Sequence, residues 1–566
     1  MSEKVKIFCE NNSQYYEVEV GTPLKAIADL IYGEPDFSGD MHNTPIAAIV
    51  DNTFKGLGYE IFYDNSVKFV DYYEPDDRRT YSRTLNFILQ KAVSELYPDK
   101  VLCCQFNLPN GLYWEICKTS YGESIELWDE DIRKIDSRMR EIVAANFPFK
   151  RSKKDNDATQ QLYHSRGQIE KAKLINSVGG KVVTVHTLDG YTDNFYGPLT
   201  ISSGYIKSFR IEKYSRGICI VMPSRKDINV FPPMQRQDKI LAMFLKHASW
   251  CRILGANSIG TINDAIRKGY AHKMINLCEI RQERLFAEIA DEILAKKDKC
   301  RIVFLAGPSS SGKTSTSKRI AGQCIVNGLV PKVVELDNYF LPRERTPKDE
   351  NGEYDFESLQ ALDLELLNKQ LNQIIAGEEV ELPTFDFKKG EQQFLGNKLK
   401  LENNEILIME GIHALNPEMT PSVDNSRILR IYASELTSLS IDENNNISTI
   451  DTRLLRRILR DNRTRGVSPE ETILRWPSVR RGENRNIFPF QENADLYFNT
   501  ALIYELPVMK HYVEPLLRRI SPKSAAYAEA KRLLGFLSKI DPISDEEIKA
   551  VPPHSIMREF IGGQIL

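Results

Sequence analysis

The sequence RIVFLAGPSSSGKTSTSKRI, residues 301–320, decides the fold of the second half of the chain. Residues 302–306 are a short apolar run of strand type, and residues 307–314 fit the pattern G-x-x-x-x-G-K-[ST]. Residues 316–326 then follow with the apolar spacing of a helix. A strand that leads through a glycine-rich turn into a helix presents backbone N–H groups and the positive end of the helix dipole to an anion. The stretch therefore predicts a site for the phosphates of a nucleotide.

Each position of this loop has an expected role. The Lys313 ammonium is expected to reach the β- and γ-phosphates, and the Thr314 hydroxyl is expected to bind Mg²⁺. The residues expected to surround the phosphates of ATP are Gly307, Ser309, Ser310, Ser311, Gly312, Lys313, Thr314 and Ser315.

The composition describes a chain of several globular domains. At 566 residues, the length favours three or four domains, each large enough to bury a core. A net charge of −3 favours neither nucleic acid nor an anionic membrane as a partner. Nine cysteines without a C-x-x-C pair indicate reduced thiols, and neither a signal-like start nor a run of 18 apolar residues is present. We therefore expect a cytoplasmic protein that does not associate with membranes.

Residues 1–68 alternate apolar and polar positions like a small sheet. Residues 5–7 and 16–20 keep the period of two that a half-buried strand requires, and a short helix is expected after the turn at residues 21–23. The segment resembles a TGS domain, the β-grasp module at the front of threonyl-tRNA synthetases. Periodicity alone also allows some other small α+β domain.

Residues 69–225 resemble the second domain of threonyl-tRNA synthetases. The resemblance rests on the stretches TYSRTLNFILQKAVSELYPDK (80–100), IRKIDSRMREIVAANFPFKR (132–151) and YTDNFYGPLTISSGYIKSFRI (191–211), which occur in the same order. In that family this domain removes wrong amino acids from tRNA around an H-x-x-x-H and a C-x-x-x-H motif. The corresponding positions here are Tyr81, Leu85, Phe195 and Leu199. None of them offers an imidazole or thiolate, so we expect a binding or structural domain whose editing centre is lost. RNA contact through residues 1–225 stays open.

The remaining boundaries follow from proline positions and helical stripes. Residues 226–298 predict a helical linker, residues 299–520 the nucleotide-binding body, and residues 521–566 a helical tail. The charged stretch RSKKDND (151–157) predicts a solvated linker between helices. The expected fold class is α/β and multidomain: a C-terminal P-loop domain with a parallel sheet, preceded by a small β-grasp domain and an α+β domain.

Two acidic residues end apolar strand-like runs beyond the loop. Asp337 follows the run in VVELDNYF (333–340), and Glu410 ends the run in ILIMEGI (406–412). Ligand sites of α/β proteins lie at the carboxyl ends of strands, where one acid can deprotonate an acceptor hydroxyl and the other can hold Mg²⁺. Either acid could instead cap the following helix.

Arginines gather in DTRLLRRILRDNRTRG, residues 451–466. Arg453, Arg456 or Arg457, and Arg460 are three or four positions apart, so they share one face of a helix. Arginines can neutralise the charge that develops during phosphoryl transfer. A basic solvated face, paired locally with Asp451 and Asp461, is the alternative.

Taken together, residues 307–466 resemble the uridine kinase and phosphoribulokinase family. The stretches that match, in family order, include GPSSSGKTS, LDNYF, the EGI after a strand, and RRILRDNRTRG. The resemblance implies ATP-dependent phosphorylation of a small-molecule hydroxyl with Mg²⁺, and self-association into a homo-oligomer is expected. It implies Asp337 as the general base, Glu410 as the Mg²⁺-associated acid and Arg457 as a catalytic substrate contact. Arg460 and Arg465 are implied as lid arginines on the ATP phosphates.

The chain departs from the family where the acceptor is recognised. Glu357 takes the place of a ribose-binding Asp, Phe385 takes the place of a base-contacting Tyr, and Gly390 takes the place of a His. A site that loses hydrogen-bond donors to a base loses discrimination. We therefore expect a ribose-like acceptor bound by Glu357, Phe385, Asp337 and Arg457, with loose selectivity for the base. Arg343, Arg345 and Lys348 could instead hold a phosphorylated sugar.

Two other functions remain open at this stage. One is a phosphoribulokinase-like kinase of a sugar phosphate. The other is an ATP-gated protein that binds RNA or a nucleotide and has no turnover, although such a switch has no need for an acceptor base such as Asp337.

Overall fold

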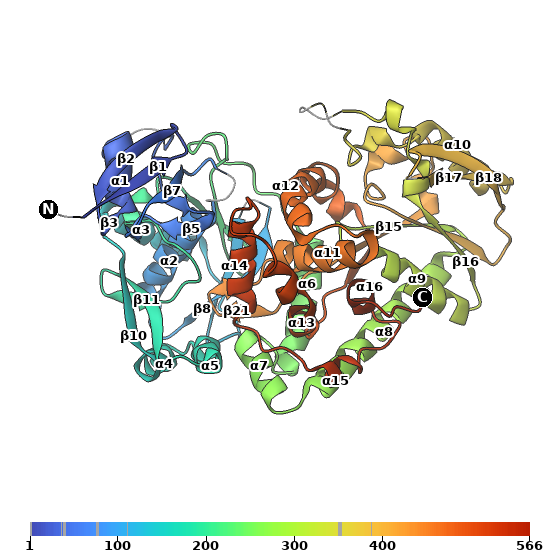
Figure 1. Cartoon of the computed structure of the whole chain (residues 1–566). Helices are drawn as coiled ribbons and strands as arrows, with labels where there is room; N and C mark the ends of the chain where they lie inside the picture. Colours follow the sequence, from blue (N-terminus) through green and yellow to red (C-terminus); the bar gives the residue numbers. More distant parts are fainter. Residues whose placement is uncertain are drawn as a thin grey trace.

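Figure 1 presents the computed structural model of the chain, which describes residues 3–35, 37, 41–74, 78–109, 111–348, 352, 354–386 and 388–566. The N-terminal half and the kinase-like half lie side by side, and helix α14 of the C-terminal segment lies between them (Figure 1). Within the described residues, no helix is both long and apolar enough to cross a membrane.

The first domain is a mixed sheet with one helix. Its strands occur in the order β2-β1-β7-β4-β5, and β1 pairs in parallel with β7. Alternate residues of β1 are buried, as the period of two predicts. The elements are β1 (Lys4–Cys9), β2 (Gln14–Glu19), β3 (Thr22–Pro23), α1 (Leu24–Tyr32), β4 (Ala47–Val50), β5 (Thr53–Gly56), β6 (Glu60–Ile61) and β7 (Asn65–Val70). The boundary expected after residue 68 therefore falls inside β7.

The second domain holds a four-stranded sheet, β13-β14-β9-β8, and a three-stranded sheet, β10-β11-β12. Tyr81, Leu85, Phe195 and Leu199 are all buried in one apolar core, so bulky side chains fill this region. The elements are α2 (Arg78–Leu96), β8 (Val101–Leu108), β9 (Gly111–Cys117), α3 (Asp129–Ala144), β10 (Lys150–Asp155), α4 (Asn156–Ser165), α5 (Ile169–Val178), β11 (Val182–Leu188), β12 (Tyr191–Asp193), β13 (Arg210–Tyr214) and β14 (Gly217–Val221).

The expectation of a linker at residues 151–157 was wrong. Residues 150–155 form strand β10, which pairs antiparallel with β11. Every side chain of β10 is exposed, so the strand carries no apolar alternation that a sequence pattern could detect. The backbone hydrogen bonds to β11, rather than burial, define this edge strand.

Three helices, α6 (Asp238–Ile253), α7 (Ile259–Arg267) and α8 (Ala271–Lys296), connect the halves. The kinase-like half is built on a parallel sheet in the order β16-β19-β15-β20-β23, with β15, the strand of the phosphate loop, in the centre. Its elements are β15 (Ile302–Ala306), α9 (Lys313–Val326), β16 (Val330–Glu335), η2 (Leu336–Tyr339), α10 (Leu364–Ile375), β17 (Val380–Asp386), β18 (Glu391–Leu399), β19 (Glu405–Glu410), β20 (Ile428–Ser434), β21 (Ser440–Asp442), β22 (Asn445–Asn446), α11 (Thr449–Arg465), α12 (Pro469–Asn486), β23 (Leu496–Asn499), α13 (Glu505–Leu517), α14 (Tyr527–Leu537), α15 (Asp545–Ile548) and α16 (Met557–Ile561).

The hairpin β21–β22 joins the two halves through buried polar groups. The Glu443 carboxylate accepts hydrogen bonds from the backbone N–H groups of Glu170 (2.7 Å) and Lys171 (2.9 Å), at the N-terminus of α5. The Lys171 ammonium is itself buried and pairs with Asp193 at 2.7 Å. It also donates to Asn444 of the hairpin at 2.7 Å. The hairpin therefore carries buried charge from the kinase-like half into the synthetase-like half.

Candidate active site

The phosphate loop follows β15 at the carboxyl edge of the sheet, and α9 begins at Lys313. At Gly307, a Cβ would lie 2.0 Å from the backbone oxygen of Ala433. At Gly312, φ is 86°, a conformation that L side chains rarely adopt. Both glycines of the motif are therefore required by backbone geometry.

Several polar groups of the loop have no protein partner. The hydroxyl oxygens of Ser310 and Ser311 are buried without a hydrogen-bond partner. The Lys313 ammonium donates only to the backbone oxygen of Pro308, at 3.2 Å, among the contacts described for it. Buried hydroxyls usually find a partner, so this cradle suits an anion with several acceptor oxygens, such as a nucleotide phosphate.

Thr314 and Glu410 meet beside the loop. β19 pairs in parallel with β15, and Leu305 lies in register with Glu410. The Thr314 hydroxyl donates to Glu410 Oε1 at 2.7 Å. Burial raises the pKa of the Glu410 carboxyl, while Lys313 and Thr314 act to lower it. A hydroxyl and a carboxylate at this spacing are two of the oxygen ligands that Mg²⁺ prefers, so these residues fit the metal expected from the sequence.

Asp337 lies in the turn η2, directly after β16. Because β19 lies between β16 and β15 in the sheet, Asp337, Glu410 and the loop reach the same edge. Burial raises the pKa of Asp337, and the neighbouring Lys313 opposes that rise. An acid with a raised pKa is a stronger base when ionised, which suits proton transfer from a hydroxyl.

Glu357 reaches the same region from the loop before α10. Its backbone oxygen accepts a hydrogen bond from Asn486 of α12. Burial, followed by the negative charge of Glu483, raises the pKa of Glu357 to about 7. Arg457 and Lys313 lower the same pKa, so both cations lie within electrostatic reach of this carboxyl.

Phe385 lies in β17, and Gly390 lies in the turn between β17 and β18. Phe385 is buried, and its ring packs edge to face on Phe340 with centroids 5.7 Å apart. Gly390 has a φ of 74°, and a Cβ there would lie 3.1 Å from Arg343 Nε. The Arg343 side chain thus lies directly against Gly390.

The arginines of α11 divide into two groups, which the expectation of one shared face did not foresee. Arg453 and Arg456 are buried and form ion pairs with Glu483 and Glu505. Their guanidinium groups also donate to the backbone oxygens of Ser309 (3.1 Å) and Ser311 (3.5 Å), so they support the loop from behind.

The second group surrounds the Asp461 carboxylate. Arg457, Arg460 and Arg465 pair with it at 3.1, 3.3 and 3.2 Å. Arg457 also donates to the Ser309 hydroxyl at 2.6 Å. Arg457 therefore lies next to the phosphate loop, and Asp461 holds the guanidinium groups of Arg460 and Arg465 beside Arg457, where cations can balance phosphate charge.

Two buried residues were missed in the sequence, and one of them contacts the phosphate loop. Glu483 accepts a hydrogen bond from Ser309 N at 3.0 Å and holds the first turn of the loop. Burial raises the pKa of Glu483, but Arg453 and Arg480 outweigh this effect and bring it below its ordinary value. His413 is buried three positions after Glu410, and burial lowers its pKa to about 4. The sequence offered one signal for His413, which is its position three residues after the strand-end acid Glu410.

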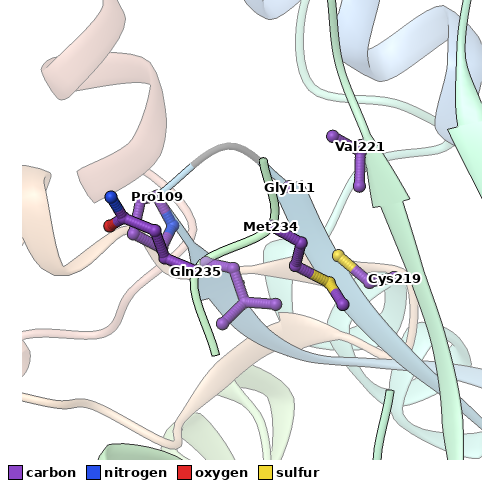
Figure 2. A pocket seen from close by; sticks show the side chains of 7 residues that line it. Pro109, Gly111, Cys219, Val221, Met234 and Gln235 are labelled. Carbon is purple, nitrogen blue, oxygen red and sulfur yellow. The ribbon is translucent and has the colours of Figure 1, made fainter. Parts of the chain in front are cut away.

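Figure 2 shows a separate small pocket in the N-terminal half. Its labelled side chains come from the region of β9 and β14 and from the segment before α6. No residue of the predicted site lines it, and no charged side chain does so either.

The parallel sheet, the phosphate loop and the strand-end acids define a domain of the P-loop kinase class. Residues 302–503 match the Phosphoribulokinase / Uridine kinase family. Over 205 residues the chain is 27% identical to a uridine kinase of Lactobacillus helveticus, a stretch that covers 36% of this chain and 88% of that protein. A solved structure described as a possible uridine kinase from Bacillus stearothermophilus is 17% identical with a TM-score of 0.27, and the match covers 39% of this chain and all of that one.

The N-terminal part matches a different group of proteins, the threonine–tRNA ligases. Over 167 residues it is 26% identical to the enzyme of Symbiobacterium thermophilum. The match covers 29% of this chain but only 25% of the ligase, so the chain spans about a quarter of that relative.

Proposed function

We propose that the chain is an ATP-dependent kinase that phosphorylates a hydroxyl of a nucleoside or another ribose-like molecule. The observation that carries the proposal is the meeting of Asp337, the Thr314–Glu410 pair and the phosphate loop at one edge of the sheet. A protein that only binds ATP has no need for a half-buried acid at the acceptor side of the loop. The family match over residues 302–503 supports the same reaction class.

Asp337 accepts the proton of the acceptor hydroxyl, and the freed oxygen attacks the γ-phosphorus of ATP. Lys313 contacts the β- and γ-phosphates. Arg460 and Arg465 exchange Asp461 for the phosphate oxygens and balance the charge that builds up as the bond to ADP breaks. Thr314 and Glu410 are the residues that would hold Mg²⁺, which would supply further charge neutralisation to the phosphates.

Glu357 and Arg457 offer an acceptor and a donor to the vicinal hydroxyls of a ribose. Phe385 offers a ring face without a hydroxyl, so base recognition is looser than in a dedicated uridine kinase. A panel of uridine, cytidine, purine nucleosides and free pentoses, each with ATP, tests this proposal. Strict preference for uridine would contradict the loose base pocket, and no turnover on any member would favour the ATP-gated binding protein.

A second acceptor class, a sugar phosphate, has its own observation in the position of Arg343. Its side chain covers Gly390, at the acceptor side of the site, and adds a positive group there. Guanidinium groups bind phosphate well, so pentose phosphates belong in the same panel. Activity only on a pentose phosphate, abolished by Arg343→Ala, would favour this class over nucleosides.

A further inference from the structure

The C-terminal segment packs against the phosphate loop, although the family match ends at residue 503. Helix α16 lies between α9 and α11 (Figure 1). Ile556, Met557 and Phe560 are buried in the core of the kinase-like half. Ile556 lies so close to the loop that a Cβ at Gly312 would come within 2.8 Å of its Cγ2. Residues 556–560 therefore form a wall beside the phosphate loop, and the burial of their apolar side chains holds this wall in place.

One carboxylate of this wall engages the end of the loop. The Ser315 hydroxyl donates to Glu559 Oε2 at 2.5 Å, and Gln564 Nε2 donates to the same hydroxyl at 2.7 Å. Arg460 Nη1 lies 3.9 Å from Glu559 Oε1. The backbone oxygen of Glu559 accepts from Arg463 at 2.6 Å, so the main chain is held independently of the carboxylate.

Ser315 is expected from the sequence to lie at the phosphates of ATP, and the proposed function assigns Arg460 to the same phosphates. A carboxylate that accepts from a hydroxyl and faces a guanidinium makes the contacts that a phosphate oxygen would make at the same place. It also adds a negative charge within a few ångströms of that oxygen, and like charges so close repel strongly. The Glu559 carboxylate and a nucleotide phosphate therefore cannot bind Ser315 and Arg460 at the same time.

We propose that Glu559 competes with the nucleotide for Ser315 and Arg460, and so lowers the affinity of the site for phosphorylated nucleotides. This inference rests on the proposed function, because it requires that ATP binds at the loop. When a nucleotide enters, the carboxylate turns away while α16 stays, since its apolar side chains and the bond from Arg463 hold the main chain. Gln564 loses its contact with Ser315 in the same step.

The test compares nucleotide binding by the wild-type chain and by the whole chain with the substitution Glu559→Gln. This substitution keeps the shape of the side chain and removes its charge. Calorimetry with Mg²⁺ and a non-hydrolysable ATP analogue is expected to give about tenfold tighter binding by the variant, with adenosine affinity unchanged. Glu546→Gln is the matched control. This exposed residue of α15 pairs with Lys549, and its change should leave both affinities as in the wild type.

Equal affinities of wild type and Glu559→Gln for the ATP analogue would overturn the inference. Weaker binding by the variant would also overturn it, because Glu559 would then favour nucleotide binding. Failure of both proteins to bind ATP would overturn the proposed function with it. If Glu559→Gln does not fold, hydrogen exchange of the wild type decides. ATP should speed exchange at Ile565, whose N–H donates to Pro553 at 3.0 Å, because it frees Gln564. Unchanged or slower exchange there would contradict the competition.

Discussion

Gly482 of α12 lies directly against Glu357, and a Cβ at position 482 would come within 2.7 Å of the Glu357 Cβ. The absence of a side chain at one residue thus sets how far the proposed acceptor carboxylate reaches into the site. We predict that Gly482→Ala displaces Glu357 and raises the KM for the acceptor by about tenfold, because misplaced positioning groups are costly. The KM for ATP should change little.

Steady-state kinetics with both substrates measures this split. Gly535→Ala in α14 is the control, because a Cβ there meets nothing within 4 Å. An equal rise in both KM values would mean that the substitution disturbs the whole domain rather than Glu357.

Asp337 and Lys313 should affect different steps. Asp337→Asn is expected to lower the rate of acceptor phosphorylation by about 10²–10⁴, the usual contribution of a positioned base, with the Kd for ATP unchanged. Lys313→Ala removes a phosphate contact and should weaken ATP binding and turnover together. Calorimetry and initial rates on the same preparations separate the two effects. Wild-type kinetics in Asp337→Asn would remove Asp337 from its proposed role.

The pKa of Glu357 predicts a pH-dependent stability. Its folded-state pKa of about 7 lies above the ordinary 4.5, so the folded protein holds a proton that the unfolded chain releases between these values. The contribution of Glu357 to stability is therefore complete below about pH 4.5 and is lost as the pH rises through 7. Glu357→Gln removes this loss, so the Tm of the variant relative to wild type should increase from about pH 5 to pH 8.

Thermal unfolding across that range measures the difference. The exposed neighbour Glu344, changed to Gln, serves as a control for general charge effects. A Tm difference that stays flat with pH would show that the carboxyl of Glu357 ionises as freely in the folded protein as in the unfolded chain.

The two groups of arginines on α11 should respond differently to truncation. Arg453→Ala leaves the buried Glu483 with Arg480 as its remaining ion-pair partner. Breaking a buried ion pair destabilises proteins by about 3–5 kcal/mol, so this variant should lose stability by up to that amount. Arg465 is mostly exposed, with a relative side-chain accessibility of 56%, so Arg465→Ala should leave stability nearly unchanged while turnover falls. Denaturant unfolding and initial rates test both halves of the contrast. A destabilised Arg465→Ala, or a stable Arg453→Ala, would contradict it.

The phosphate loop and the strand-end acids could be predicted because their signals are local. A strand, a glycine-rich turn and a helix occur within about twenty residues, and parallel strands bring their carboxyl ends to one edge. Glu483 and Glu559 could not be found this way. They lie far along the chain on helices, and helical periodicity indicates which face is buried but not which element covers it.

The arginine helix illustrates the same limit. Spacing places Arg453 and Arg460 on one face, yet only tertiary packing decides that Arg453 is buried against Glu483 while Arg460 pairs with Asp461. The strand β10 was missed for the opposite reason, since its fully exposed side chains leave no alternation to detect. The domain divisions and the roles of the site residues remain predictions.

The hairpin β21–β22 has a consequence for cooperativity. The Glu443 carboxylate is bound by the backbone of α5, and Lys171 lies buried between Asp193 and Asn444. Separating the halves would therefore expose apolar surface and leave these buried charges without their partners. We therefore predict that neither half folds independently of the other. Scanning calorimetry should record one transition rather than two, and a chain cut at residue 298 should give pieces that aggregate alone and recover their solubility only when refolded together.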